Sequence, residues 1–505
     1  MIGVEFLSDL ALFAVLMMNV YFSDFFNISE ETLENYGAFN ISVLVDLPLF
    51  IDPFLLFNST KPEYRRLHDE MIRYLRFLRD WSVGRVVTPG LLSAWYCFKE
   101  VKQNWLGFCA GRNSGHGLGS DFARSLHDSL GAIFLDFGQE RITKGSHLEK
   151  VCLIKPGVGR DTISDFTTNL IKEFLLEYTQ TFALRFISAE RRRRFAVQKV
   201  RFNFETFSWE PRSYELPWDG SDYVLLTPKD ILTRDDTWIN KEDFFREFED
   251  IPLAIGNAEL RAQIDAYFRS MLPRDAQKAD QEQAIAKTAL KFPELFDYFI
   301  KRKEDTGNEA AARSSKKVSI SRAIYVEQFR SLIETLSQLT PFYAASPSTR
   351  VETRRRIEYL KDVIENKGGY RIFYYDGKPL RRETDLQILY RLVWFASPHD
   401  VSREVNDGRG PVDFKISYGA FDKTLVEMKL ATNTGLKRNL QSQAEIYQEA
   451  SDAATAYKVI VYFAAQELEK VRRILRELGL EGHESIILID ARSDNKPSAS
   501  KASAI

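Results

Sequence analysis

The sequence predicts an α/β fold, α+β overall, and three observations support this class. The 505 residues are 44% hydrophobic and 28% charged, which is typical of globular domains and excludes wholesale disorder. Residues 383–491 alternate helical and strand patterns in the order α-β-β-β-α-β-α-β, as in a sheet covered by helices. Helical patterns over 61–83 and 241–300, with turn-rich segments between them, predict a larger mixed α/β N-terminal region.

The length suggests about three domains at the usual domain size. Residues 1–300 are expected to form the mixed α/β region, with a role in recognising a target or a partner. Residues 301–320 are charged and poor in apolar side chains, which predicts a linker or an exposed helix at a domain boundary. A helical connector is expected over 321–382 and a compact α/β domain over 383–492. Residues 493–505 are expected to be a disordered tail.

Charge and cysteine content exclude several classes of protein. Lys and Arg total 69 against 71 Asp and Glu, whereas a protein that coats nucleic acid would be more basic. The three cysteines, Cys97, Cys109 and Cys152, form no CxxC or Cys/His cluster, which argues against a disulfide framework and a structural zinc site. The start of the chain lacks the basic region of a signal peptide. We therefore expect a reducing, cytoplasmic location.

The first sixty residues contain no Lys, Arg or His. The apolar run from Leu10 to Phe22 is shorter than the ~20 residues of a membrane span and has no basic flank. It is expected to be a buried helix or strand, and no membrane partner is expected. Met17 and Met18 precede the expected ordered start, which raises the hypothesis that residues 1–17 are an upstream extension.

Two N-terminal segments place basic residues where they suit phosphates. In the loop 155–165, Lys155 and Arg160 flank glycines at an expected helix start, but the Walker pattern is absent and an ordinary loop is favoured. The stretch 190–202 has six basic residues interleaved with Phe. A solvated helix face is favoured there over a nucleic-acid track.

Two neighbouring strands, 412–418 and 423–431, carry the most informative side chains. Because strand side chains alternate, Asp413 lies on one face of its strand, and Glu427 and Lys429 share one face of the next. If both apolar faces point to one core, these three polar side chains converge on the opposite face. Asp413 and Glu427 lie directly opposite each other if the turn holds an odd number of residues, as a Gly-Ala-Phe turn does.

Two carboxylates and a lysine on one face of a half-buried sheet are costly without a function. Carboxylate oxygens suit a hard divalent cation such as Mg²⁺. Such an ion lowers the pKa of a bound water and neutralises charge that develops on a phosphate. A lysine beside it orients that water or helps to deprotonate it. The pattern therefore predicts hydrolysis of phosphodiester bonds.

At these residues the chain resembles the PD-(D/E)XK nuclease superfamily, which has the restriction-endonuclease-like fold. The match is "GPVDF", a fourteen-residue gap from Asp413 to Glu427, "EMK", and "QAEIY" in the following helix, which is similar to the Q-x-x-x-Y element of the RecB-like branch. The resemblance covers about a fifth of the chain. An E-x-K triplet alone is weak, but the motifs in this order are far more specific. The resemblance implies an αβββαβ core.

The resemblance also implies a role for each matching residue. Asp413 and Glu427 would hold Mg²⁺, for which Mn²⁺ is expected to substitute, and Lys429 would serve the nucleophilic water. Gln443 and Tyr447 would support the site or the substrate.

Further residues near the motif are weaker candidates. The family has one more acid on the preceding helix; Glu383 is preferred and Glu404 is a close rival, which the sequence does not separate. Four basic residues flank the strands and suit phosphate oxygens, although exposed ion pairs are equally favoured for them: Arg403, Arg409, Lys437 and Arg438.

The sequence thus predicts a Mg²⁺-dependent endonuclease, with DNA favoured over RNA and a prokaryotic antiviral defence role favoured by analogy. The main alternative is a catalytically inactive nucleic-acid-binding or scaffold protein with a nuclease-like fold. A third is an unrelated enzyme that uses the loop 155–165 on a nucleotide. A homo-oligomer or a partner protein bound through the N-terminal region is left open.

Overall fold

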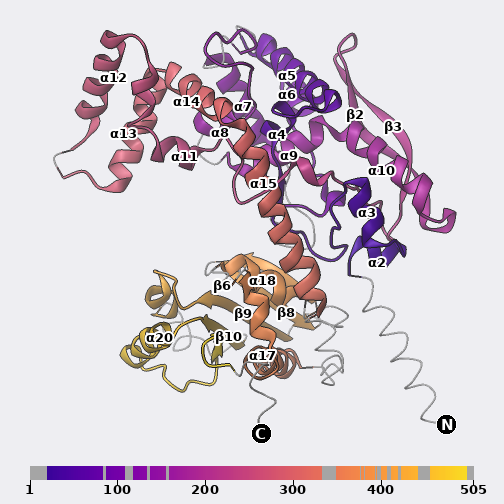
Figure 1. Ribbon diagram of the computed structural model, residues 1–505, viewed down its shortest axis with the longest axis vertical. Helices are drawn as coiled ribbons and strands as arrows, with labels where there is room; N and C mark the ends of the chain where they lie inside the picture. Colours follow the sequence, from indigo (N-terminus) through magenta and orange to yellow (C-terminus); the bar gives the residue numbers. More distant parts are fainter. Residues whose placement is uncertain are drawn as a thin grey trace. The chain divides into compact units, whose positions relative to one another are not determined.

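The computed structural model (Figure 1) describes residues 20–83, 87–107, 118–132, 137–154, 158–273, 275–331, 348–375, 377–379, 382–392, 394, 400–406, 411–418, 422–441 and 455–496. It divides the chain into two compact units. The N-terminal unit comprises Phe22–Phe108 and Gly115–Ser319, and the C-terminal unit begins at Ile320. Both helices and strands are present, so the predicted α+β class is confirmed.

The N-terminal unit is mainly helical. Its helices are α2 (Phe22–Phe26), α3 (Glu30–Tyr36), α4 (Pro53–Phe57), α5 (Pro62–Ser82), α6 (Pro89–Tyr96), α7 (Ser120–Ala132), α8 (Lys150–Ile154), α9 (Arg160–Leu170), α10 (Lys172–Phe186), α11 (Lys241–Arg246), α12 (Ala258–Met271), α13 (Lys278–Lys291), α14 (Glu294–Asp305) and α15 (Gly307–Arg322). Strands β1 (Leu49–Ile51) and β4 (Leu232–Arg234) pair with each other, as do β2 (Arg192–Asn203) and β3 (Ser208–Pro217). Short 3₁₀ turns lie at Lys102–Asn104, Ala189–Arg191, Lys229–Ile231 and Ile251–Ala254.

Helix α5 forms where the amphipathic pattern of 61–83 predicts a helix. Pro62 opens the helix, where its fixed φ and missing N–H are tolerated. The apolar positions at helical spacing, Leu67, Met71 and Leu75 among them, are buried in the main core of this unit. The helices predicted over 241–300 are also present, as α11 to α14.

The basic stretch 190–202 is not a helix, contrary to expectation. From Arg192 onward its residues form strand β2, which pairs with β3 in an antiparallel hairpin with one register shift between Val197 and Arg201. Phe195 and Val197 before the shift, and Val200 and Phe202 after it, alternate with more exposed residues, as in a strand with one covered face, and β3 pairs with both parts.

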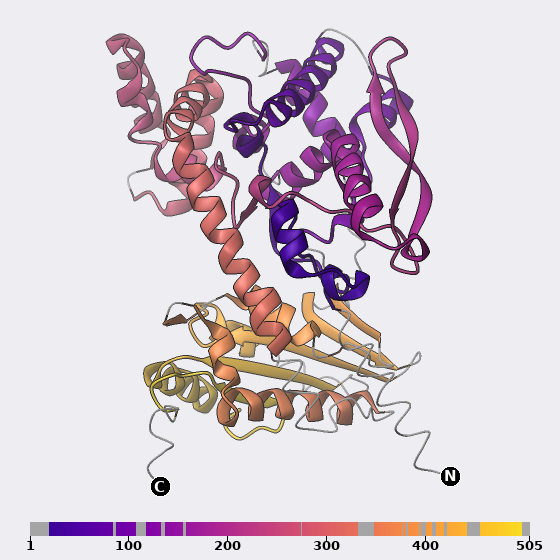
Figure 2. The ribbon, with the colours of Figure 1, turned by 45° about the vertical axis from the view of Figure 1, so that its right-hand side comes forward.

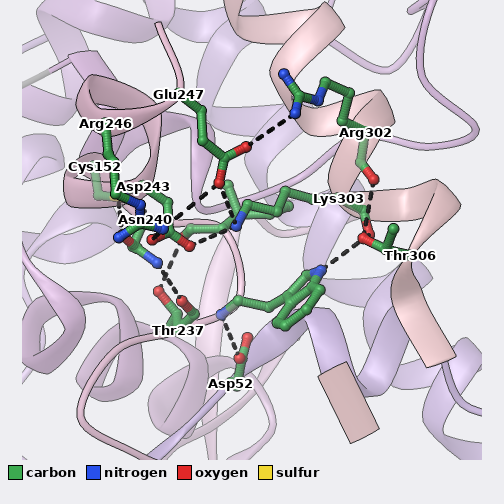
Figure 3. A network of polar contacts seen from close by, with 12 residues as sticks. Asp52, Cys152, Thr237, Asn240, Asp243, Arg246, Glu247, Arg302, Lys303 and Thr306 are labelled. Carbon is green, nitrogen blue, oxygen red and sulfur yellow. Dashed lines mark hydrogen bonds and ion pairs between the residues drawn. The ribbon is translucent and has the colours of Figure 1, made fainter. Parts of the chain in front are cut away.

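Residues 301–320 form helices, the second of the two predicted alternatives, because α14 and α15 run through them. Their charges are used inside the N-terminal unit (Figure 3). Buried Lys303 pairs with Asp243 and lies 3.6 Å from Glu247, and Arg302 also lies 3.6 Å from Glu247. The charge of Lys303 is thus neutralised by partners distant in the chain, whereas residues such as Lys301, Glu309 and Lys316 are exposed. The boundary between the units falls just before Ile320, within α15.

The C-terminal unit is built on a five-stranded sheet of order β11-β10-β9-β8-β7. Strands β7, β8 and β9 are antiparallel neighbours, and β9, β10 and β11 run parallel. The element bounds are β7 (Asp400–Asn406), β8 (Pro411–Tyr418), β9 (Asp422–Leu430), β10 (Thr455–Tyr462), β11 (Ile486–Asp490), α17 (Thr349–Asn366), α18 (Glu383–Leu392) and α20 (Ala465–Glu477), with a π-helical turn (Ala323–Gln328), a 3₁₀ turn (Gly369–Phe373) and a small hairpin of β5 (Tyr374–Tyr375) and β6 (Lys378–Pro379). The described strands and helices follow the predicted order of 383–491; residues 442–451 of the expected helix 435–451 lie outside the described residues.

Helix α17 runs along one face of this sheet (Figure 2). The Thr349 hydroxyl lies 2.8 Å from that of Thr424 on β9. Buried Arg356 pairs with Glu352 at 2.6 Å and lies over the ring of Trp394. The predicted helical connector 321–382 is therefore part of the packed C-terminal unit, because its apolar side chains complete the core of the sheet.

The predicted ends of the chain are partly corrected. Asn495 donates a 2.8 Å hydrogen bond to Asp490, so the ordered chain continues past 493, where a disordered tail was expected. Residues 497–505, the proposed extension 1–17 and most of the apolar run after Leu10 lie outside the described residues. No helix in the described part of the chain is both long enough and apolar enough to cross a membrane.

Candidate active site

The candidate site begins with the register of strands β8 and β9. Phe414 pairs with Val426, and the last pair is Tyr418 with Asp422, so three positions lie between the strands as the Gly-Ala-Phe turn predicts. Continuing the register by one step places Asp413 opposite Glu427. The predicted alternation holds: Phe414 and Val426 are buried on the face that α17 covers, and the polar side chains lie on the other.

Lys429 lies among three carboxylates. Its Nζ is 3.4 Å from Glu383 Oε2, 3.5 Å from Asp413 Oδ2 and 3.6 Å from Glu427 Oε1. Glu383 comes from the start of α18, so one helix and two strands contribute to the cluster. The structure thus brings together four of the residues singled out in the sequence, including the preferred additional acid.

Neighbouring donors fix two of the carboxylates. Asp413 Oδ1 accepts a 2.8 Å hydrogen bond from the Gln387 side chain, and Oδ2 accepts one of 2.6 Å from the backbone N–H of Met428. The Asn433 side chain donates a 2.5 Å hydrogen bond to Glu383 Oε1. Sequence reasoning missed Gln387 and Asn433. Gln387 carries a detectable signal, because it lies one helical turn after Glu383 and so on the same helix face.

A second lysine, Lys458, also belongs to the cluster and was missed. It is paired in register with Glu427 across the parallel strands β9 and β10, and its Nζ lies 2.9 Å from Glu427 Oε2. Its signal in the sequence is a single charge inside the otherwise apolar strand "AYKVIVYF". A buried charge is expensive unless it is paired, so such an interruption marks a site of interest.

Burial and charge shift the pKa values in this cluster. Burial raises the pKa of Asp413 above its usual range, against the opposing effect of Lys429 and the Met428 N–H. Burial alone would lower the pKa of Lys429, but Asp413, Glu427 and Glu383 together raise it. Lys429 is therefore firmly protonated, and the cluster holds more negative than positive charge.

The donor chemistry of the cluster fits a hard divalent cation. Among the described residues, no three Asp, Glu, His or Cys side chains are already spaced as ligands of one ion. Mg²⁺, however, is commonly held by one or two carboxylates, with waters and substrate phosphates completing its shell. Asp413 and Glu427, neighbours on adjacent strands, provide such a pair.

The remaining predicted residues are not part of the described cluster. Arg409, Gln443 and Tyr447 lie outside the described residues, as do the side chains of Arg403 and Glu404 on β7. Lys437 and Arg438 are exposed, and Lys437 pairs with Glu477 at 2.7 Å.

In the loop 155–165, Arg160 lies at the first position of α9. It pairs with Asp236 at 3.0 Å and lies over the ring of Phe50. Lys155 is outside the described residues. The described part of this loop thus uses its basic residue in a contact within the protein.

Comparison with known proteins gives two matches, both to families described as domains of unknown function. The model of DUF8370 matches residues 27–240, and that of DUF8371 matches residues 349–465. The second match runs from the first residue of α17 to the first residue of α20 and includes all five charged residues of the cluster. No match was found among curated proteins or solved structures.

Proposed function

We propose that the C-terminal unit is a Mg²⁺-dependent endonuclease of the PD-(D/E)XK type that hydrolyses phosphodiester bonds, with DNA as the favoured substrate. One observation carries the proposal: Lys429 lies within 3.6 Å of the carboxylates of Asp413, Glu427 and Glu383 on one side of the sheet. Strongly charged, partly buried clusters of this kind are frequent at catalytic sites.

Each residue of the cluster has a role in this reaction. Asp413 and Glu427 would hold the ion, which supplies charge neutralisation at the phosphate and a water that ionises easily. Because its pKa is raised, Lys429 acts as a fixed cation that orients the water and faces phosphate oxygens, rather than as a free base. Gln387 and Asn433 hold Asp413 and Glu383 in place.

The wider biological role is part of the same proposal. The N-terminal unit carries a different matched domain in the same chain, which supports a separate task such as recognition of a target, a partner or a second copy of the chain. By analogy with the nuclease family that the motifs resemble, we propose a cytoplasmic defence effector. An inactive scaffold is less well supported, because Asp413, Glu427 and Lys429 are all present and clustered.

Cleavage assays on plasmid DNA, linear DNA and RNA test the proposed function. We expect cutting with Mg²⁺ or Mn²⁺, none with EDTA, and a loss of at least about 100-fold in Glu427→Ala and Lys429→Ala. Lys367→Ala is the matched control, because this lysine of the C-terminal unit pairs with Asp362 instead. Cutting that survives both cluster substitutions would refute the assignment of the site.

A further inference from the structure

Lys458 is a buried cation that the hydrolysis mechanism leaves without a role. Its side chain is 2% exposed, and its ammonium lies 2.9 Å from Glu427 Oε2. The same ammonium donates a 2.5 Å hydrogen bond to the backbone carbonyl of Asn439. These two partners fix the ammonium beside Glu427. Burial lowers the pKa of Lys458 below its usual range, whereas Glu427 opposes this shift and favours the charged form.

Glu427 lies between two lysines that approach its two oxygens separately. Oε1 is 3.6 Å from Lys429, and Oε2 is 2.9 Å from Lys458. In two-ion phosphodiesterases the ions lie about 3.5–4 Å apart. A carboxylate shared by two such ions must offer one oxygen to each. Here Lys458 occupies the side of Glu427 that a second ion would need.

The charges of the cluster lead to the same conclusion. Asp413, Glu427 and Glu383 contribute −3, and Lys429 and Lys458 contribute +2, which gives −1. One divalent ion changes the sum to about +1, which a phosphodiester neutralises. Two ions would give about +3 in a mostly buried site, where unbalanced charge is costly.

We propose that Lys458 replaces a second divalent cation, so that the site binds one ion per chain. This inference rests on the proposed metal-dependent function and specifies its ion requirement. Lys458 is a positioning residue in this scheme, because it acts through Glu427 and not on the substrate. It holds Oε2 of Glu427 and would leave Oε1 for the single ion.

Counting bound Mn²⁺ tests the proposal without relying on catalysis. The full chain is titrated with Mn²⁺, and free ion is measured by electron paramagnetic resonance. We expect one ion per wild-type chain and two in Lys458→Met, which keeps the side-chain length and removes the charge. Lys367→Met, which removes a paired charge outside the cluster, should still bind one.

The outcomes separate this inference from the function on which it rests. Two ions in the wild type, or one ion in both wild type and Lys458→Met, would overturn the role of Lys458. No bound ion in the wild type would overturn the metal-dependent function as well. One ion in the wild type and two in the variant, without cleavage of any substrate, would support the role of Lys458 and refute the nuclease.

A second pair of variants covers the case in which Lys458→Met does not fold, as judged by circular dichroism. Lys458→Arg keeps the charge and is expected to bind one ion, whereas Lys458→Gln keeps a donor for the Asn439 carbonyl and is expected to bind two. Equal counts in these two variants would also overturn the proposal.

Discussion

Two buried lysines, Lys150 of the N-terminal unit and Lys429 of the C-terminal unit, are neutralised in different ways. In the N-terminal unit, Lys150 meets Asp297 at 2.6 Å, and both side chains are almost completely buried. In the C-terminal unit, Lys429 faces three carboxylates, none closer than 3.4 Å. A close pair between two elements is what stability requires. An ammonium that is outnumbered by carboxylates indicates a site that accepts further positive charge.

The pKa shifts of two aspartates show the same contrast between the units. Asp243 of the N-terminal unit is partly desolvated, which raises its pKa, but Lys303 and Arg246 outweigh this and lower the pKa below its usual range. Asp413 has a raised pKa, because burial outweighs the help of Lys429. Asp243 thus stabilises the fold in its charged form, whereas the charged form of Asp413 is maintained at a cost in stability.

The largest expected effect is on stability and comes from Lys150→Met. Removing one partner of a buried pair leaves an uncompensated charge, so we expect a loss of about 3–5 kcal/mol in the free energy of unfolding. Lys429→Met should lose less, about 1–3 kcal/mol, because its contacts are longer and its side chain is more exposed, 11% against 3% for Lys150. Chemical denaturation measures both. The reverse order would remove the distinction between a structural pair and a functional cluster.

Asn substitutions at the two aspartates should change stability in opposite directions near pH 7. When the folded pKa of a carboxyl group is raised, the protein becomes less stable as the pH rises from the unfolded pKa through the folded pKa. Asp413→Asn removes this cost, so we expect its free energy of unfolding to increase by about 1 kcal/mol. When the folded pKa of a carboxyl group is lowered, the charged group stabilises the protein above its unfolded pKa, and this stabilisation disappears as the pH falls through the folded pKa. We therefore expect Asp243→Asn to decrease the free energy of unfolding by about 1–3 kcal/mol.

Denaturation of both variants from pH 3 to pH 8 tests this pair of predictions. The advantage of Asp413→Asn should vanish at the acidic end, where the wild-type carboxyl is protonated in both folded and unfolded states. The deficit of Asp243→Asn should shrink there as well. If both variants had a lower free energy of unfolding than the wild type at pH 7, Asp413 would be an ordinary structural carboxylate.

The sequence alone predicts the local parts of this site. The period-two pattern and the odd turn length predict that Asp413, Glu427 and Lys429 share one face, and these depend on only a few neighbouring residues. The helix over 61–83 is predicted for the same reason. Such features are local, so alternation and turn chemistry are sufficient to define them.

The features that the sequence does not predict all depend on distant partners. Lys458 reaches Glu427 only through the parallel pairing of β10 with β9, which a crossover connection separates in the chain. The sequence predicts that Lys303 lies in a solvated segment, but Asp243, sixty residues earlier, neutralises its charge. The basic stretch of β2 becomes a strand because β3 pairs with it. Composition carries no information about such partners.

The smallest expected effect concerns Lys437, which is exposed and paired with Glu477. If it contacts a phosphate during cleavage, Lys437→Ala should reduce the salt dependence of DNA affinity by about one unit of slope, with little change in stability. Glu477→Ala is the matched variant, because it releases the lysine and should strengthen binding. Fluorescence anisotropy with catalytically inactive Glu427→Ala as the background, at several salt concentrations, measures both. Unchanged slopes in both variants would assign Lys437 to the surface ion pair alone, and the contacts to DNA would then have to come from other parts of the chain.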